Sequence, residues 1–360
     1  MKVLMITQSF CPYIGGVEKH VRRVSEELIR KGHNVVVVTS KGSSELRGSE
    51  MIGNIPVHRF LKTRNLIRIW LWFIRHAILI RNATIIHCHD YYVFVYWYLP
   101  FRFLFFLKPV FITFHGWEGH FPPGRKEILL RKLSALLTKR NMCIGQYISK
   151  WYKVQCNYVS YGGTDSFQST PSIANRSKNK ALYIGRLSDD NAFLEYVKIL
   201  EVLKTKYDID FDLQVYGNGP LGRLASEYAH IHSLGVSLHR PVENPFEHSN
   251  DSIVAFSPGY LAILEAMIHK TIVCSIFNNE LKRDYLLSFP ASSRLPIGIP
   301  LTAASAEELA DKLVSILDDP QKTELMGQEG FEIARQMTWK RVACAYLKMY
   351  SESREQTTEF

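Results

Sequence analysis

The sequence lacks any closely spaced pair of cysteines. Its six cysteines are scattered over 360 residues, so neither the ligand spacing of a zinc site nor the framework of a disulfide-rich domain is present. We therefore expect reduced, partly buried thiols and a cytoplasmic protein. The residues concerned are Cys11, Cys88, Cys143, Cys156, Cys274 and Cys344.

Uninterrupted hydrophobic runs are also scarce. The first apolar run, residues 3–6, is too short for a signal peptide, so export is not expected. The more apolar stretch 91–114 is divided by prolines and basic residues, which favours a helix followed by a buried strand over a membrane span. These dividing residues are Pro100, Arg102, Lys108 and Pro109.

Acidic residues are few in the first half of the chain. Residues 1–165 contain 24 Lys and Arg against 9 Asp and Glu, whereas the remainder contains 20 against 25. A domain this basic favours an anionic partner, either a nucleic acid or a phospholipid surface. A solvated basic face is the ordinary alternative.

The pattern of apolar residues predicts an α/β architecture. Short β-branched runs alternate with segments of helical periodicity along residues 3–137 and again along residues 181–275. Such alternation is typical of doubly wound parallel sheets with helices on both faces. Residues 161–180 are rich in Gly, Ser, Thr, Pro and Asn, as expected for a connection between domains. Residues 306–350 predict three helices, interrupted at Asp319-Pro320 and near Met337-Thr338.

A pair of glycines follows the first predicted strand. Gly15 and Gly16 precede a predicted helix over residues 17–31, so that backbone amides at the helix start can face an anion. The alternative is that the turn needs glycine for its geometry alone.

The continuation of this loop resembles glycosyltransferase family 4. The helix begins Val17-Glu18-Lys19-His20-Val21 and ends at a Gly32-His33 turn into the second strand. The family has the GT-B fold and transfers sugars with retention of configuration. The resemblance therefore implies two Rossmann-like doubly wound domains facing a cleft, with residues 1–165 on the acceptor side and residues 166–335 binding the nucleotide-sugar donor. Residues 336–360 are expected to form a helix that crosses back to the N-terminal domain.

Two further strand ends in the first domain match the family. Residues 85–90 end in His87-Cys88-His89-Asp90, and residues 110–116 end in His115-Gly116. Open α/β sheets bind ligands at the carboxyl ends of their strands. By resemblance, His115 lies over the transferring sugar and is a candidate catalytic residue, although a lone histidine is more often structural. His87 and His89 are candidates only for hydrogen bonds that hold the loop.

The second domain carries the predicted donor site. Gly185-Arg186 resembles the diphosphate-binding turn of the family, and Arg186 suits it because a planar guanidinium donates two charge-assisted hydrogen bonds to phosphate. Arg186 is thus a candidate for both catalysis and donor binding. The resemblance adds Gly217 and Gly219 in the nucleotide pocket, the helix start at Gly259, Tyr260 and Leu261, and Glu265 at the ribose hydroxyls.

The chain also departs from the family pattern. Asn191-Ala192 stands where the family carries Lys-Gly, and Ser257 stands where its first glutamate falls. Residues 277–280 replace a Gly-rich turn. One cationic contact to the diphosphate is lost unless Lys282 or Arg283 supplies it.

No Asp-x-Asp pair lies in a loop suited to carrying a diphosphate-bound metal. Asp189-Asp190 and Asp318-Asp319 are interpreted as helix caps or solvated acids. We therefore expect no metal and no cofactor, only a nucleoside-diphosphate sugar as substrate.

Residues 65–81 predict a strongly apolar helix with arginines seven residues apart. Such a helix can lie at a bilayer interface, with tryptophans at headgroup level and arginines at lipid phosphates. The residues predicted to contact the membrane are Arg68, Trp70, Trp72 and Arg75. The alternative is a helix buried against the sheet.

Together these features predict a retaining glycosyltransferase, peripheral on the cytoplasmic face of a membrane, that acts on a lipid-linked or polysaccharide acceptor. The alternative is a catalytically weakened GT-B protein that binds glycans or nucleotides, or a partner subunit. Nucleic-acid binding is not expected, because the basic domain lacks an aromatic platform motif and a recognition helix. Nothing in the sequence indicates an oligomeric state.

Overall fold

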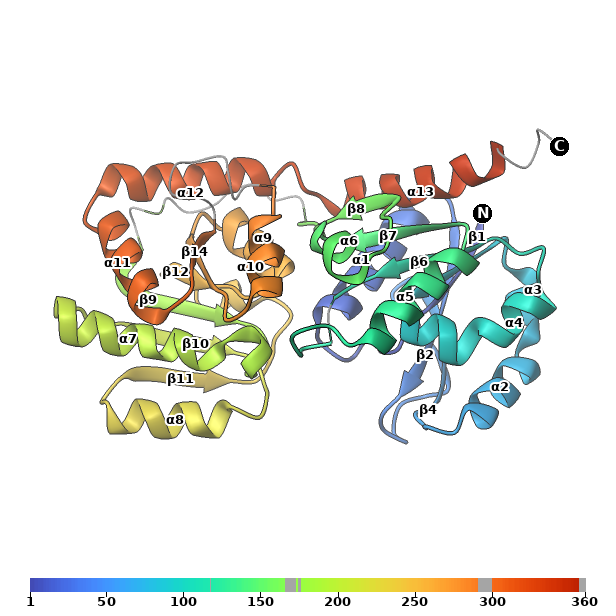
Figure 1. Ribbon diagram of the computed structural model, residues 1–360, viewed down its shortest axis with the longest axis horizontal. Helices are drawn as coiled ribbons and strands as arrows, with labels where there is room; N and C mark the ends of the chain where they lie inside the picture. Colours follow the sequence, from blue (N-terminus) through green and yellow to red (C-terminus); the bar gives the residue numbers. More distant parts are fainter. Residues whose placement is uncertain (117, 166–172, 174–175, 291–299, 356–360) are drawn as a thin grey trace. The chain divides into compact units, whose positions relative to one another are not determined.

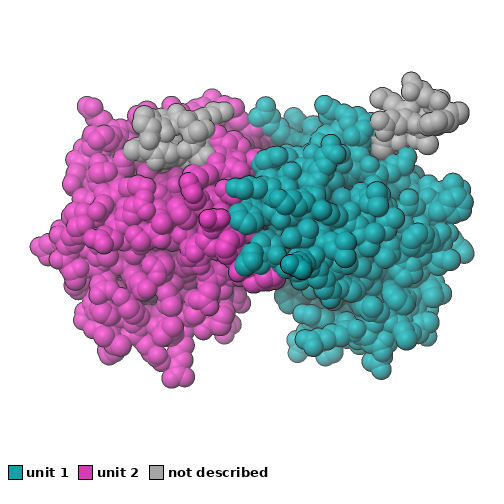
Figure 2. Space-filling model, viewed as in Figure 1, with its two compact units in different colours: residues 1–118, 122–160, 339–360 teal, residues 119–121, 161–338 magenta. Residues whose placement is uncertain are grey.

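The computed structural model describes residues 1–116, 118–165, 173, 176–290 and 300–355. The chain forms two compact units (Figure 2). Unit 1 comprises residues 1–118, 122–160 and 339–360, and unit 2 comprises residues 119–121 and 161–338. The junctions therefore lie at 160/161 and 338/339, against 165/166 and 335/336 in the sequence-based division. Part of the predicted connection, residues 166–172 and 174–175, lies outside the described residues.

Unit 1 is built on an eight-stranded sheet of order β3-β4-β2-β1-β5-β6-β7-β8, parallel except for the antiparallel pair of β3 and β4. Strands β5 and β6 are buried along their whole length, as expected for a parallel sheet covered on both faces. The strands are β1 (Lys2–Ile6), β2 (Asn34–Lys41), β3 (Ser49–Ile52), β4 (Ile55–Leu61), β5 (Ile85–His89), β6 (Val110–Phe114), β7 (Arg140–Ile144) and β8 (Tyr158–Ser160).

The helices of unit 1 begin and end where local chemistry dictates. Helix α1 ends at Gly32, whose φ of +80° permits its amide and that of His33 to bond back to the last turn. The predicted long helix over residues 65–81 breaks at His76 into two. These helices are α1 (Gly16–Arg30), α2 (Leu66–Arg75), α3 (Ala77–Asn82), the π-helix η1 (Val93–Tyr98), α4 (Leu99–Leu104), α5 (Arg125–Leu137), α6 (Tyr147–Tyr152) and α13 (Trp339–Glu355).

Unit 2 has a six-stranded parallel sheet of order β11-β10-β9-β12-β13-β14 (Figure 1). The strands are β9 (Ser177–Ile184), β10 (Asp212–Tyr216), β11 (Gly235–His239), β12 (Ser252–Phe256), β13 (Ile272–Ile276) and β14 (Leu301–Ala303). The helical elements are η3 (Asp189–Asn191), α7 (Phe193–Tyr207), α8 (Gly222–Ile231), η4 (Pro245–Glu247), α9 (Tyr260–Ile268), α10 (Glu280–Leu287), α11 (Ala306–Leu317) and α12 (Pro320–Ala334).

Both sheets reverse their strand order at one point. In unit 1 the order reverses between β1 and β5, and in unit 2 it reverses between β9 and β12. The loops that leave neighbouring strands at such a point diverge to opposite sides of the sheet and leave a crevice at the carboxyl ends. Each unit thus presents the doubly wound topology predicted from the sequence, with one place where a ligand is expected.

Helix α13 belongs to unit 1, although the chain reaches it only after completing unit 2. It packs against α1, and its inner face buries Trp339, Tyr346 and Tyr350. The Tyr346 hydroxyl lies 2.9 Å from Nε2 of His20 and 2.7 Å from Oγ1 of Thr113. The helix therefore supplies polar partners for groups buried on α1 and β6.

Replacing Tyr346 by Phe is expected to lower the free energy of unfolding of unit 1 by about 1–3 kcal/mol, because two buried polar groups lose their partner. All six tryptophans of the sequence fall within the ranges of unit 1, so tryptophan fluorescence in a urea titration reports on this unit. Tyr158→Phe is the matched control, since the Tyr158 hydroxyl also reaches α13, at partly exposed Glu352. Equal losses in the two variants would contradict a special role for the buried hydroxyl.

Candidate active site

Four histidines gather at the carboxyl end of the unit 1 sheet. His87 and His89 lie on β5, His115 directly follows β6, and His20 lies on α1. His89 Nδ1 and His115 Nε2 are 2.9 Å apart, and the rings of His20 and His115 meet edge to face at 4.9 Å. Because one of two hydrogen-bonded ring nitrogens must donate and the other accept, His89 and His115 hold complementary tautomers.

Tyrosines of α13 complete this cluster. His87 bonds through Nδ1 to the Tyr350 hydroxyl at 2.8 Å and through Nε2 to Thr113 Oγ1 at 2.8 Å. Thr113 in turn bonds to Tyr346, which reaches His20. A continuous chain of hydrogen bonds therefore runs from α13 across β6 and β5 to α1, and it fixes the ring orientations of two of the four histidines.

Burial keeps these imidazoles neutral. Burial is the main cause that lowers the pKa of His87 and of His115 to about 3, and it lowers the pKa of His20 and His89 well below the usual value. A neutral imidazole donates one hydrogen bond and accepts another, so His115, which is half-buried, can contact a sugar hydroxyl but does not supply a positive charge. His89 Nε2 is buried and has no hydrogen-bond partner among the described residues.

A buried arginine shapes the chain after β6. Arg131 on α5 donates to the Gly116 carbonyl and, at 2.8 Å, to Glu118 Oε1. Its guanidinium also lies 4.1 Å from the ring centroid of Tyr152, whose hydroxyl donates to Glu118 at 2.6 Å. Burial by itself would lower the pKa of Arg131, but the negative charges of Asp90 and Glu118 raise it, and the net shift is upward. The position of the backbone next to His115 thus depends on a desolvated ion pair.

The glycine loop of unit 1 opens α1 as predicted. Gly15 is the N-cap of α1, and the Glu18 carboxylate folds back against it. A carboxylate at this place is stabilised by the helix dipole, as a phosphate would be. The preceding loop is held by Arg59, which donates to the Cys11 carbonyl at 2.6 Å. Gly16 is the first residue of the helix.

In unit 2 the predicted donor residues follow β9, β10 and β12. The Gly185-Arg186 turn follows β9, and a Cβ on Gly185 would lie 2.8 Å from Pro258 in the turn after β12. The two turns therefore touch at the point where the sheet reverses its strand order. Arg186 is exposed and pairs with Asp190, and Tyr183 donates its hydroxyl to the Arg186 carbonyl at 2.8 Å.

Gly217 and Gly219 have a structural reason of their own. A Cβ on Gly217 would lie 2.0 Å from the Gly185 carbonyl oxygen, and one on Gly219 would lie 2.3 Å from that of Leu187. Both glycines allow the turn after β10 to pack directly on the turn that carries Arg186. The two glycines therefore help to position the turn that carries Arg186.

The start of α9 already has a polar partner. Gly259 is the N-cap, and the amide of Tyr260 donates to the Tyr285 hydroxyl at 2.8 Å. The Tyr260 hydroxyl donates to the Tyr285 carbonyl at 2.6 Å, and the two rings stack at 3.9 Å. Leu261 is the second residue of the helix and Glu265, half-buried, the sixth. Tyr285, on α10, is a site residue that the sequence did not predict.

Lys282, also on α10, lies buried beside this turn. Its Nζ donates to the Pro258 carbonyl at 2.6 Å and lies 4.7 Å from the centroid of the Tyr285 ring. Asn191, which stands where the family carries lysine, donates to the Arg186 carbonyl at 3.2 Å. The structure therefore places the ammonium group of Lys282 beside this turn, whereas η3 has Asn191 at the position where the family carries a lysine.

Comparisons with known proteins show what the chain is similar to. Residues 14–154 match the model of Glycosyltransferase Family 4. The match covers 141 of the 360 residues and shows that this part of the chain is similar to the family. A stretch of 95 residues is 28% identical to one of the subunits of human phosphatidylinositol N-acetylglucosaminyltransferase, covering 24% of this chain and 20% of that protein. The match thus spans about a fifth of the curated relative.

Solved structures show that the chain has the GT-B fold. It is similar over 98% of its length to sucrose-phosphate synthase from Thermosynechococcus elongatus, covering 98% of that chain with a TM-score of 0.75 and 16% identity. Anabaena HepE in complex with UDP matches over 98% of this chain and 100% of its own, with a TM-score of 0.74 and 15% identity. The predicted resemblance to glycosyltransferase family 4 and the predicted α/β fold class are confirmed.

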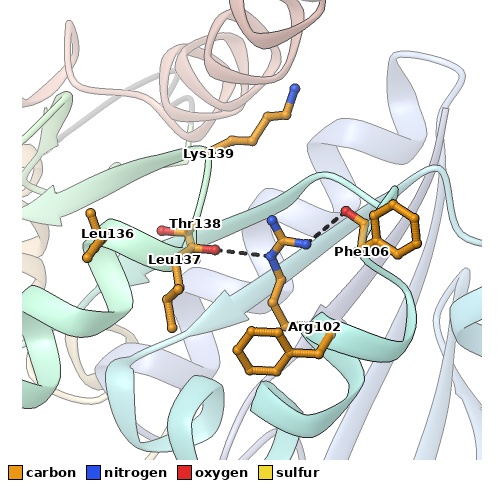
Figure 3. A pocket seen from close by; sticks show the side chains of 7 residues that line it. Arg102, Phe106, Leu136, Leu137, Thr138 and Lys139 are labelled. Carbon is orange, nitrogen blue, oxygen red and sulfur yellow. Dashed lines mark hydrogen bonds between the residues drawn. The ribbon is translucent and has the colours of Figure 1, made fainter.

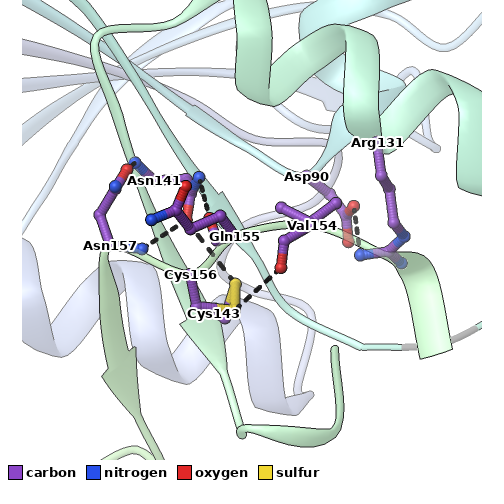
Figure 4. The surroundings of a disulfide bond; sticks show 8 residues. All are labelled: Asp90, Arg131, Asn141, Cys143, Val154, Gln155, Cys156 and Asn157. Carbon is purple, nitrogen blue, oxygen red and sulfur yellow. Dashed lines mark hydrogen bonds and ion pairs between the residues drawn. A yellow bond between two sulfur atoms is a disulfide. The ribbon is translucent and has the colours of Figure 1, made fainter. Parts of the chain in front are cut away.

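One sequence-based expectation for the chain is wrong. Cys143 and Cys156 form a disulfide, whereas all six cysteines were expected to be reduced (Figure 4). Cys143 lies on β7, and Cys156 lies two residues before β8. Because these two strands pair, the Cα atoms of the two cysteines are 5.8 Å apart. A separation of 13 residues matches no short cysteine motif, so only the strand pairing could have indicated it. Cys11, Cys88, Cys274 and Cys344 take no part in this disulfide.

The tryptophans of the apolar helix α2 contact other parts of unit 1. Trp70 Nε1 donates to the Tyr96 carbonyl at 3.0 Å, and Trp72 stacks on His76 at 4.0 Å. Arg68 and Arg75 are exposed, together with Ile67, Leu71 and Ile74 on α2 and Ile78 on α3. None of the described helices is long and apolar enough to span a bilayer.

A second apolar surface of the same unit lies at the end of α4 and directly after it. Phe103, Leu104, Phe106 and Leu107 are 64–83% exposed. A shallow pocket lies beside them, lined by Arg102, Phe103, Phe106, Leu136, Leu137, Thr138 and Lys139 (Figure 3). Arg102 holds the segment in place by donating to the carbonyls of Leu137 at 3.1 Å and Phe106 at 2.9 Å. The sequence-based membrane residues did not include this segment.

The histidine cluster is expected to make unit 1 less stable in acid. The pKa of His87 falls from about 6.5 in the unfolded chain to about 3 in the fold, so between these values the unfolded state binds more protons. Stability is therefore lost as the pH falls through this window, by about 1.4 kcal/mol per pH unit for each such histidine. His87→Gln, followed by urea unfolding between about pH 4 and about pH 6, should show a shallower dependence on pH. Exposed His230→Gln is the control, and an unchanged slope for His87→Gln would refute the cause.

Proposed function

We propose that this chain is a retaining glycosyltransferase that binds a nucleoside-diphosphate sugar in unit 2 and transfers the sugar to a membrane-proximal glycan or glycolipid. The observation that carries the proposal is the contact between the Arg186 turn and the start of α9 at the strand reversal of unit 2. A helix start and an exposed arginine at such a point form a site for phosphate groups.

The diphosphate is proposed to replace Asp190 as the partner of Arg186. In the structure this ion pair is between residues four apart, and the arginine side chain is 66% exposed, so its exchange for a ligand costs little. As the bond from the sugar to the diphosphate breaks, negative charge grows on the leaving phosphate. A donor aimed at that charge is worth about 3 kcal/mol in the transition state. We propose that protein cations serve here without a metal ion.

The remaining roles follow from position. Glu265, on the helix that starts at Gly259, is proposed to accept hydrogen bonds from the ribose hydroxyls. His115 is proposed to contact the transferring sugar as a neutral imidazole, in accord with its lowered pKa. UDP, named for Anabaena HepE, is the first nucleotide to test.

The acceptor is proposed to lie at a membrane on the cytoplasmic side. Between residues 62 and 108 the sequence has seven Lys and Arg and a single acidic residue, Asp90, whose carboxylate faces Arg131. Exposed apolar side chains of α2 and of the segment after α4 accompany these cations. Apolar residues interleaved with cations match an anionic bilayer surface, each nearby cation adding about 1 kcal/mol. The human relative is named for transfer to phosphatidylinositol, a membrane lipid.

Arg186→Ala is expected to lower sugar-nucleotide turnover by about 100-fold and to abolish the thermal shift that the sugar nucleotide produces in the wild type. Glu265→Ala should weaken nucleotide affinity. The matched control is Arg223→Ala, because Arg223 is also an exposed arginine of unit 2 paired with a carboxylate four residues on. The assay is a screen of UDP-, GDP- and ADP-sugars with EDTA and with Mg²⁺, in the presence of membranes.

Unchanged kinetics and unchanged thermal shifts in both site variants would show that the donor site is elsewhere. A protein that is protected by a nucleotide diphosphate but turns over no sugar nucleotide would instead be the weakened, binding-only member of the family.

Replacing Phe103, Phe106 and Leu107 together by serine is expected to reduce co-sedimentation with vesicles of anionic phospholipid at least about 10-fold, because apolar area and interleaved cations act together at the bilayer. Leu224 and Ile231, exposed on unit 2, are replaced by serine as a control. Wild-type binding should fall with added salt and be weak for neutral vesicles. Equal binding by the loop variant and the wild type would remove this surface from the proposal.

A further inference from the structure

Lys282 is an unusual residue for its position. It lies in the first turn of α10, where the Asn279 side chain caps the helix, and its side chain is only 2% exposed. An ammonium group is strongly hydrated in water, so burying it is costly unless other groups replace that hydration. A methionine or leucine would fill the same space without this cost.

The protein supplies few partners for the buried charge. An ammonium has three N–H donors, and among the described residues Lys282 makes one hydrogen bond, to the carbonyl of Pro258. No carboxylate of the described residues lies within salt-bridge distance of it. The face of the Tyr285 ring, at 4.7 Å, is the other stabilising contact. The site therefore holds a cation whose capacity to donate hydrogen bonds is not used up.

The negative charge that acts on Lys282 is shared with a second cation. Burial is the main cause that lowers its pKa to about 8, with a smaller contribution from the Arg186 guanidinium, while Asp190 acts in the opposite direction. Asp190 also serves Arg186, so two cations share one carboxylate. In the same turn the buried Ser257 Oγ has no hydrogen-bond partner among the described residues. Unused donors and surplus positive charge are the features expected of a site for an anion.

We propose that Lys282 is the second phosphate-binding cation of this enzyme, acting beside Arg186 in place of the lysine that the family carries where Asn191 stands. This inference rests on the proposed function, since it assumes that the diphosphate of the donor lies at the turn after β12. The ammonium contacts one phosphate group as a point charge, while Arg186 contacts the diphosphate with two parallel N–H groups. Asn191 keeps only the structural bond to the Arg186 carbonyl.

A purely structural role makes a different prediction. If Lys282 only ties α10 to the Pro258 carbonyl, its replacement changes stability but not the affinity for phosphate. If it binds the diphosphate, affinity for nucleoside diphosphates falls while affinity for the corresponding nucleosides, which lack phosphate, does not. A lysine returned to position 191 would then restore the lost contact.

The test compares Lys282→Met, Lys282→Arg and the double variant Lys282→Met/Asn191→Lys by calorimetric titration with UDP, GDP and ADP, and with uridine, guanosine and adenosine. Lys282→Met should lower diphosphate affinity at least about 10-fold at neutral pH, the loss expected for one charge-assisted contact. Asn191→Lys should recover most of it, and Lys282→Arg should retain part. Lys198→Met, an exposed lysine of unit 2 paired with Glu195, is the control.

The pH profile gives a second readout in the unmodified protein. Because the ammonium loses its proton as the pH rises through its pKa of about 8, diphosphate affinity of the wild type should decline above that pH, and the decline should be absent in Lys282→Met. The charged and titratable groups facing Lys282 are Arg186, Asp190 and Tyr285, and the pKa of Tyr285 is raised by burial, which keeps it neutral in this range.

The outcomes separate the two proposals. Wild-type diphosphate affinity in Lys282→Met, together with loss of binding in Arg186→Ala, would overturn the role of Lys282 and leave the proposed function standing. Binding that survives both substitutions would overturn the donor site itself. If Lys282→Met unfolds, the wild-type and Lys282→Arg profiles decide: affinity should decline above about pH 8 in the wild type but not in Lys282→Arg, whose side chain stays charged, and a flat wild-type profile contradicts a titrating phosphate contact.

Discussion

The close packing of three turns at the carboxyl edge of the unit 2 sheet is the constraint on which the candidate donor site depends. The turns after β9, β10 and β12 touch through backbone atoms and Pro258. This contact leaves no room for a Cβ atom at positions 185, 217 and 219, which are all glycine. This contact fixes where Arg186 leaves the sheet and where α9 begins. It follows from the parallel topology, in which all strands end at one edge and their loops must share the space above it.

The two units divide the chemistry between them. Unit 2 concentrates positive charge at its strand reversal, on Arg186 and Lys282, whereas the corresponding edge of unit 1 holds four histidines that burial keeps neutral. Neutral imidazoles suit contacts with sugar hydroxyls, and cations suit phosphate groups. The basic character of unit 1 therefore comes from its lysines and arginines and not from its histidine cluster.

Local signals in the sequence predicted much of this structure. Gly32 ends α1, and Asp319 with Pro320 starts α12, because capping and backbone freedom act within a few residues of the chain. Motif order also placed Arg186 and His115 at strand ends. The sequence did not indicate contacts made between distant segments: the disulfide of Cys143 and Cys156 depends on the pairing of β7 and β8, and Tyr285 reaches α9 from α10. The outward or inward orientation of Trp72 likewise depends on Phe60, a residue of β4, which lies against it.

The return of α13 to unit 1 constrains the order in which the protein can be completed during synthesis. During synthesis the residues of unit 2 leave the ribosome before those of α13. Until α13 emerges, His20, His87 and Thr113 of the N-terminal segment lack the tyrosine hydroxyls that bond to them in the finished fold. Domains usually fold as units while the chain is being made. Here unit 2 is formed almost entirely by one continuous segment, so it can fold before synthesis ends. Unit 1 begins at the N-terminus but needs the last helix to complete its fold.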